Sequence, residues 1–419
     1  MGHITTVAAG RSAEEVFKAE SSVLSLEKGV LIDVLHLHYV VDPLTFEIGM
    51  TVNPVVAKLA IPSPKIPQYT DRIIVGLNRG LERLLGDEES ITLKHPSLFF
   101  QKWVAYMSVP SLIGEEVATN TDVISSFANF TGDVTNNIPA FMIIPKIFHR
   151  FLLPFMQSKN HHRQVMRDHV VPVIRRRRAK MAEAAAQGKP HGLELNFLQG
   201  LIEYVKPDGS QYSDEDIANA ILLVAFASVH TTSMNMSFAL YWLLARPDLL
   251  VELKKEMNDV LGDGPVTSEG LEKMKFLDCF LRESLRRGVD KLAGSKKVLQ
   301  DFTFSNGYQV PKGRTVQTAS LQLNLGLDIS KEALDQMDPS LSKDRRTTTP
   351  ARDFVTFGMG KHLCPGRFFA VHEIKLSLIT LLRRYDISTL SGQSPKPVHY
   401  FGGAMAMNCE DPLLLEKRK

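Results

Sequence analysis

A long apolar segment, residues 217–245, limits the folds open to this chain because it contains no Asp, Glu, Lys or Arg. A segment of this length can cross a bilayer. Its middle, however, carries polar residues from Ser228 to Asn235, and polar groups at the centre of a bilayer are costly. Ser213 and Asp216 form a capping box before the segment. We therefore expect a buried central helix in a mainly helical protein rather than a membrane span.

A glycine-rich loop, residues 357–366, reads Phe-Gly-Met-Gly-Lys-His-Leu-Cys-Pro-Gly and carries Cys364 near its end. Gly358 and Gly360 permit positive φ angles and a close approach to a flat ligand. Apolar spacing predicts an amphipathic helix over residues 367–382. A helix N-terminus favours a thiolate over a thiol, and a cysteine thiolate can be an axial ligand of haem iron. The alternative is an ordinary core cysteine before a helix.

The whole loop resembles the haem-binding signature of the cytochrome P450 superfamily. The fixed positions of that signature are matched by Phe357, Gly360, His362, Cys364 and Gly366. The continuation Cys-Pro-Gly-Arg-Phe-Phe-Ala is similar to fungal members that oxidise terpenoids and other secondary metabolites. The resemblance implies a mainly α haem-thiolate fold with a small β portion, in which Cys364 holds the iron and His362 hydrogen-bonds a haem propionate.

A second motif lies inside the apolar segment, where Ala227 and Thr231 share one helix face. The string Ala-Ser-Val-His-Thr-Thr resembles the oxygen-activation motif of the family. This implies that Thr231, with Thr232 and His230 beside it, guides protons to dioxygen. The Thr231 hydroxyl is expected to bond the carbonyl four residues earlier, and the alternative to an oxygen-activating role is a helix-interior threonine satisfied by its own backbone. Ser228 replaces the usual glycine and His230 the usual acid, so His230 is either a proton relay or a satisfied core histidine.

Glu283 and Arg286 form a Glu-x-x-Arg pair that meets on one helix face. The pair resembles the buried Glu-x-x-Arg element of the family, which normally gains a third member from a later arginine. The matching region, residues 337–343, has no arginine. Arg345 and Arg346 are the substitutes that we consider.

Further site residues follow from the order of the motifs. Lys296 and Lys58 stand where relatives carry cations for the haem propionates, although plain surface lysines are nearly as common an explanation. Methionines in a pocket wall are alternatively core filling. The residues that lie in segments lining the substrate pocket of relatives are Ala227, Leu292, Ala293, Met405 and Met407.

Few segments predict strands. Residues 298–304 and 309–316 flank an Asn-Gly turn, and residues 397–415 are expected to form a hairpin around a Gly-Gly pair. A single helix is predicted over residues 271–287. A basic block, residues 175–178, is either a solvated helix face or a lipid-surface contact.

Composition restricts the remaining classes. The chain has 419 residues, 44% of them hydrophobic, which suffices for a large core, and we treat residues 1–419 as one domain. A net charge of +3 is too small to indicate a nucleic-acid partner. Three cysteines without paired spacing indicate a reducing compartment. The histidine pairs lack acidic or cysteine neighbours at zinc spacing, so we predict no zinc site.

The first thirty residues contain no signal-type apolar run. The resemblance begins near residue 23, which implies that the N-terminal membrane anchor and the first strands of the family are absent here. We therefore expect a cytoplasmic protein, or one held peripherally at the endoplasmic reticulum, without a transmembrane anchor in this chain.

The resemblance implies an oxidoreductase, a monooxygenase that hydroxylates a small apolar molecule with electrons from an NADPH-dependent reductase. Lys361 and Arg367 are candidate contacts for that reductase. The altered residues Ser228 and His230 leave a second hypothesis, a redox-neutral haem-thiolate isomerase, dehydratase or cyclase. A third hypothesis is a haem-poor binding protein of the same fold.

Overall fold

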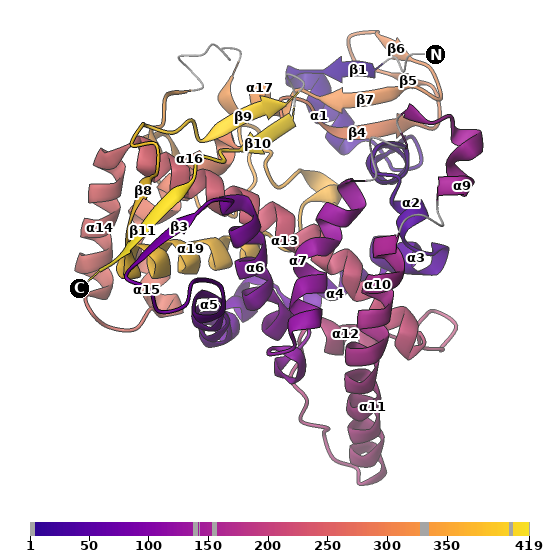
Figure 1. Ribbon diagram of the computed structural model, residues 1–419. Coiled ribbons are helices and arrows are strands. Elements are labelled where there is room, and N and C mark those ends of the chain that lie inside the picture. Colours follow the sequence, from indigo (N-terminus) through magenta and orange to yellow (C-terminus); the bar gives the residue numbers. More distant parts are fainter. Residues whose placement is uncertain are drawn as a thin grey trace.

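The computed structural model describes residues 5–136, 141, 143–152, 157–326, 335–401 and 405–418. Helices form most of the molecule, and small sheets lie along two of its margins (Figure 1). A mainly helical architecture with a small β portion agrees with the prediction from sequence.

The central element is α13 (Asp214–Ala245), on which helices from several parts of the chain pack. It begins at the predicted capping box, because Ser213 accepts from the backbone of Asp216 and Asp216 accepts from the backbone of Ser213. Within the described residues, α13 is the one helix long and apolar enough to cross a membrane, and 56% of its most apolar window is buried inside the protein. This burial agrees with the predicted central helix.

The helices that contact α13 are α3 (Pro43–Thr51), α6 (Pro96–Leu112), α7 (Thr121–Thr135), α11 (Val171–Ala186), α12 (Phe197–Glu203), α14 (Pro247–Leu261), α16 (Lys275–Arg287) and α19 (Arg367–Arg384). The others in the described chain are α1 (Gly10–Lys18), α2 (Leu37–Val40), α4 (Asn53–Ala60), α5 (Thr70–Leu85), α9 (His149–Leu152), α10 (Gln157–Val165), α15 (Ser268–Lys273) and α17 (Ser320–Leu325). The predicted helix over residues 271–287 is divided into α15 and α16 at Met274, whose φ of −77° and ψ of 84° are not helical.

The largest sheet has the order β1-β7-β4-β2. Here β1 (Thr5–Ala8) runs parallel to β7 (Thr315–Thr318), and β4 (Ala293–Val298) pairs antiparallel with both β7 and β2 (Leu24–Ser25). A short hairpin, β5 (Phe302–Thr303) with β6 (Gln309–Val310), occupies the predicted Asn-Gly turn. The two predicted strands are therefore four shorter ones, because the chain turns again between each pair.

Two further sheets contain the last strands of the chain, and one of them also includes a strand from residues 90–93. One is antiparallel, in the order β3 (Ser90–Leu93), β11 (Leu413–Lys417), β8 (Tyr385–Thr389). The other is the predicted hairpin of β9 (Val398–Phe401) and β10 (Met405–Asn408), whose Gly-Gly pair lies outside the described residues.

The N-terminal segment packs on the largest sheet through a small core of its own. This second core contains Ala8, Ala13, Val16, Leu24, Val298, Phe304, Val310 and Val316. Strands β1 and β2 thus occupy the two edges of the sheet, where we expected the first strands of the family to be absent. The absence of the family's own first strands from this chain stays a prediction.

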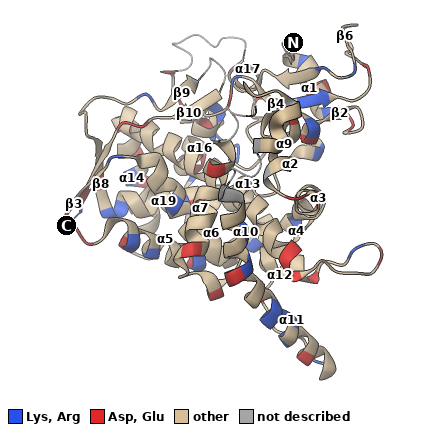
Figure 2. Cartoon of the chain, turned by 45° about the vertical axis from the view of Figure 1, so that its right-hand side comes forward, with Lys and Arg blue, Asp and Glu red and all other residues tan. Residues whose placement is uncertain are grey.

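Charges of both signs lie on the outer helices, including α5, α11 and α14, while α13 carries few (Figure 2). The basic block on α11 is not a uniformly solvated face. Arg177 is 6% exposed, and its guanidinium donates to Glu116 Oε1 at 2.9 Å and to Asn196 Oδ1 at 3.1 Å. The prediction of a solvated face is wrong for Arg177, because a carboxylate and an amide supply its partners inside the protein.

Candidate functional site

The glycine-rich loop has the backbone that its sequence predicts. Gly358 and Gly360 have φ angles of +74° and +62°, which side chains with a Cβ rarely adopt. A Cβ at position 358 would lie 2.9 Å from the carbonyl oxygen of His362. The loop is closed by the Cys364 N–H, which donates to Phe357 O at 2.8 Å. The Phe357 ring packs edge-on against Phe354 at 6.1 Å.

Cys364 precedes α19, whose N-cap is Gly366. Burial raises the pKa of the Cys364 thiol, and the N–H groups of Gly366 and Arg367 with the Arg367 charge oppose that rise. The helix terminus therefore acts in the predicted direction, but burial outweighs it. A bound metal cation deprotonates a coordinating thiol outright. The site is thus suited to a thiolate that a metal ion holds.

Arg367 fixes the position of the loop. Its Nη1 donates to Cys364 O at 2.9 Å and its Nε donates to Thr348 O at 3.1 Å. The guanidinium also lies 4.2 Å from the centre of the Phe368 ring. This residue, a candidate contact for a reductase, is half-buried and makes these contacts within the chain.

Positive groups gather beside the loop. Lys296 on β4 is only 2% exposed, its Nζ donates to Val16 O at 2.6 Å, and burial lowers its pKa to about 8. In the described chain no carboxylate lies within ion-pair distance of Lys296. Burial, Lys296 and Lys361 lower the pKa of His362. A buried lysine without an acidic partner is costly, and an anionic group bound here would offset that cost.

The second predicted cation, Lys58, is exposed on α4. Ile61, which ends that helix, lies near the loop, because a Cβ at Gly366 would be 4.0 Å from Ile61 Cδ1. The structure thus brings Lys296 and His362 together and leaves Lys58 at the surface of a neighbouring helix.

The middle of α13 presents an open face although most of the helix is buried. Ala227 and Thr231 are exposed, whereas Val229 and Thr232 on the same turns are buried. Thr231 Oγ1 donates to Ala227 O at 2.7 Å, as predicted. An exposed strip on the central helix of a large core provides space for a bound group.

Ser228 and His230 border this strip. The Ser228 Oγ atom is buried and has no hydrogen-bond partner among the described residues. Burial lowers the pKa of His230, so its imidazole is neutral at pH 7. A neutral imidazole can accept one proton and donate another. Its assignment as a relay stays a prediction.

Glu283 is the centre of a buried charge cluster. It is fully buried, and its carboxylate accepts from Arg286 Nε at 2.7 Å and from Arg286 Nη2 at 2.9 Å. The third member is Arg287, whose Nε donates to Glu283 Oε1 at 2.7 Å. Arg345 instead pairs with Asp353 at the surface. The third member of the cluster is therefore Arg287, on the same helix as Glu283, and not Arg345 or Arg346 as expected.

The predicted substrate residues lie in two segments. Leu292 and Ala293 are half-buried before and at the start of β4. Met405 and Met407 on β10 are 53% and 46% exposed and alternate with the buried Ala406. Neither methionine is core filling, so the alternative explanation is wrong for both.

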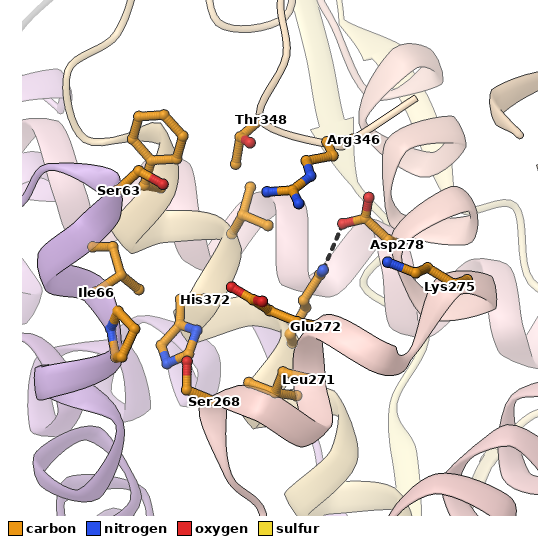
Figure 3. A pocket seen from close by; sticks show the side chains of 14 residues that line it. Ser63, Ile66, Ser268, Leu271, Glu272, Lys275, Asp278, Arg346, Thr348 and His372 are labelled. Atoms are coloured by element: carbon orange, nitrogen blue, oxygen red, sulfur yellow. Dashed lines mark hydrogen bonds and ion pairs between the residues drawn. The ribbon is translucent and has the colours of Figure 1, made fainter. Parts of the chain in front are cut away.

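A separate surface pocket of about 130 Å³ lies between α15, α16, α19 and the turn Ser63–Tyr69. Figure 3 shows Arg346, Glu272 and His372 around it, with Asp278 bonded to Lys375. None of its lining residues is a predicted haem or substrate residue. It borders the part of α19 that follows the cysteine loop, and it is not the open face of α13.

Sequence reasoning missed a buried acid, Glu373, on the core side of α19. Its Oε1 accepts from Ser108 Oγ at 2.8 Å, and its Oε2 has no partner among the described residues. Burial raises the pKa of Glu373 to about 8, and the Ser108 bond opposes that rise. A signal was present, since Glu373 is on the same helix face as the apolar residues Phe369 and Leu376.

Glu373 makes a testable contribution to pH-dependent stability. The unfolded chain releases this proton near pH 4.5, and the folded chain keeps it up to about pH 8. Between these values the free energy of unfolding should fall by about 1.4 kcal/mol per pH unit, on the order of 5 kcal/mol in all. Glu373→Gln should flatten this decline in denaturant titrations followed by tryptophan fluorescence. Glu252→Gln, at an exposed position of α14, should not. Equal slopes for both variants would contradict this account.

These observations agree with a haem. Cys364 can supply the sulfur ligand of the iron, and the buried cation Lys296 suits the anionic edge of the ring. The open strip at Thr231 provides space for a flat group. The loop backbone permits the close approach that such a group needs.

Comparisons with known proteins point to one family. The family model described as Cytochrome P450 matches residues 89–414. Cytochrome P450 monooxygenase 71 of Postia placenta is 30% identical over 67% of this chain and 58% of its own length. Cytochrome P450 monooxygenase 110 of the same fungus is 27% identical over 90% of this chain and 74% of its own length. Cytochrome P450 monooxygenase pyr3 of Aspergillus fumigatus is 30% identical over 80% of this chain and 66% of its own length.

A solved structure supports the fold. Retinoic acid-bound cyanobacterial CYP120A1 superposes with a TM-score of 0.74 at 20% identity, covering 98% of this chain and 88% of that one. This likeness confirms the predicted mainly α fold. The chain spans between 58% and 74% of the lengths of the three fungal relatives.

Proposed function

Because this chain belongs to the cytochrome P450 family, we propose that it is a haem-thiolate monooxygenase. Its reaction is the hydroxylation of a small apolar secondary metabolite, of which a terpenoid is one class, with dioxygen and electrons from an NADPH-dependent reductase. The observation that carries the proposal is the Cys364 loop, where a cysteine, two positive-φ glycines and a helix N-terminus occur together. The fungal relatives named as monooxygenases support it.

In this proposal the protein holds the cofactor at its iron and at its propionates. Cys364 ligates the iron, and Lys296 and His362 neutralise the propionates, with Lys58 as a further cation. Gly360 and Gly366 keep the loop free of side chains beside the ring, and Phe357 adds an aromatic contact. Haem supplies the activation of dioxygen when it is bound, and the protein orients and tunes it.

Proton handling is assigned to α13. The Thr231 hydroxyl donates a hydrogen bond to Ala227 O, so its lone pairs are available to accept a hydrogen bond from water. His230, neutral at pH 7, and Thr232 stand on adjacent positions of the helix. The substrate lies against Ala227, Leu292, Ala293, Met405 and Met407 in this proposal.

The electron donor approaches the outer side of the cysteine loop. Lys361 is 63% exposed and pairs with the equally exposed Glu20, so a partner acid can exchange with Glu20. Arg367 is half-buried and donates to the carbonyls of Cys364 and Thr348, and it remains the second candidate contact in this proposal. We place the protein in the cytoplasm or peripherally at the endoplasmic reticulum, where such reductases act.

The test is a spectrum followed by a turnover assay. The purified protein should bind haem in equal amount and, when reduced under carbon monoxide, show the red-shifted band of a thiolate-ligated haem. With NADPH, a fungal reductase and a panel of terpenoids under labelled dioxygen, a product should carry one labelled oxygen atom. A colourless preparation from haem-supplied cells would overturn the proposal.

A redox-neutral isomerase, dehydratase or cyclase is the second candidate, favoured by the buried Ser228 hydroxyl beside His230, which has no hydrogen-bond partner in the described part of the chain. Such a hydroxyl has a free donor and acceptor for proton transfer without electrons. Product formation without NADPH or reductase would establish this alternative. Strict dependence on both would remove it.

A further inference from the structure

We propose that Asp290 is a positioning residue that holds the β9–β10 hairpin against the end of α16 and thereby sets the shape of the substrate site. The inference rests on the proposed function, because it concerns the same site. Asp290 lies in the short segment between α16 and β4, directly before Lys291 and Leu292.

The hydrogen bonds of the hairpin converge on one cross-strand pair. Asp290 Oδ1 accepts the backbone N–H of Ala406 at 2.7 Å. Ala406 is directly opposite Tyr400 in the hairpin register. Tyr400 OH in turn donates to Arg287 O at 3.3 Å. Both strands are therefore attached at their middle to residues 287–290.

A third contact comes from Lys291, whose Nζ lies 4.6 Å from the centre of the Tyr400 ring. An ammonium over an aromatic face contributes about 0.5–1 kcal/mol at an exposed site. Three neighbouring residues of one segment, Arg287, Asp290 and Lys291, thus bind the same hairpin.

The segment that holds the hairpin is itself fixed. Gly288 packs on Phe238 of α13 so closely that a Cβ at position 288 would lie 2.4 Å from Phe238 Cδ2. Arg287 is anchored to the buried carboxylate of Glu283. A rigid support of this kind transmits the position of α13 and α16 to whatever Asp290 binds.

The hairpin needs such an attachment. Within the described residues β9 and β10 pair only with each other, and an isolated two-stranded hairpin is marginally stable in water. Met405 and Met407 flank Ala406 and point to the opposite face from it. The hydrogen bond at Ala406 N therefore determines where these two methionines stand relative to α13, which β10 contacts.

The test compares Asp290→Ala with Asp301→Ala. Asp301 is a matched control, because its Oδ1 accepts the backbone N–H of Lys312 at the same 2.7 Å, beside the β5–β6 hairpin far from the cysteine loop in sequence. Two nitrogenous haem ligands serve as probes, bulky clotrimazole and small imidazole, and absorption difference spectra give their dissociation constants. Hydrogen–deuterium exchange of residues 398–408 reports on the hairpin directly.

We expect Asp290→Ala to weaken clotrimazole binding about fivefold, the value of one net hydrogen bond, with imidazole binding unchanged. Exchange across residues 398–408 should rise. Asp290→Asn, which retains an acceptor oxygen, should stay near the wild type, as should Asp301→Ala. If Asp290→Ala does not accumulate, Tyr400→Phe should shift both readouts in the same direction by a smaller factor.

An unchanged ratio of clotrimazole to imidazole affinity in Asp290→Ala would overturn the inference, even where exchange of the hairpin rises. Failure of the proposed function looks different, because the wild type itself would then lack the red-shifted carbonyl band. The band should persist in Asp290→Ala, since the hydrogen bonds of the described residues connect the Asp290 side chain to Ala406 and not to the cysteine loop.

Discussion

Cys364→Ser should eliminate the red-shifted ferrous–carbonyl band and reduce monooxygenase turnover to background. Serine keeps the size of the side chain and the loop hydrogen bond from residue 364 N to Phe357 O, which is made by the backbone. It removes the sulfur, the one donor at this site that gives electron density to iron as a thiolate does. Absorption spectra of the reduced protein under carbon monoxide, together with product analysis, measure the effect.

Cys279→Ser is the matched control. Cys279 is half-buried on α16, its thiol donates to Ser342 O at 3.6 Å, and it lies outside the glycine-rich loop. Its replacement should preserve the band and the turnover. If Cys364→Ser retained both properties, another residue would hold the iron and the proposed function would be lost.

Glu283→Gln should have the largest effect on folding. The substitution leaves Arg286 and Arg287 side by side at a buried site without the carboxylate that both contact at 2.7 Å. Removing one partner of a buried ion cluster costs about 3–5 kcal/mol, because uncompensated charge remains inside. Since Arg286 of the cluster also donates to Asn324 O and so joins the end of α16 to α17, we expect little soluble, haem-bearing protein. Denaturant titration of what accumulates gives the lost stability.

Arg345→Gln provides the comparison. The pair of Arg345 and Asp353 is about half exposed on both sides, and exposed pairs contribute no more than about 1 kcal/mol. The variant should accumulate and bind haem like the wild type. If Arg345→Gln lost as much stability as Glu283→Gln, Arg345 would have to belong to the buried cluster. That result would contradict the assignment of Arg287 as its third member.

The sequence predicted elements whose signals are local. Ser213 and Asp216 define the start of α13 because a capping box needs only four consecutive residues. Gly358 and Gly360 predicted positive φ for the same reason. The bond from Thr231 to Ala227 O also follows from spacing along one helix. The predicted site residues are placed on the expected elements, and their roles stay predictions.

Features that depend on distant partners were not predictable. Arg177 belongs to a basic block in sequence, and only Glu116 and Asn196, from other elements, explain its burial. Residues 5–8 and 24–25 form the strands β1 and β2 because they pair with β7 and β4, which are distant in sequence. Arg287 was within reach of sequence reasoning, since it stands four residues after Glu283.

The N-terminal segment touches the cationic side of the cysteine loop at three points. Val16 O accepts from Lys296, Glu20 pairs with Lys361, and Ser21 Oγ lies 3.4 Å from His362 Nε2. In the proposed function Lys296 and His362 also hold the cofactor. Docking of residues 16–21 and retention of haem are then thermodynamically linked, and each changes the equilibrium of the other by the same factor. Amino acid exchanges within residues 16–21 would therefore change the affinity for haem, without any contact to the iron.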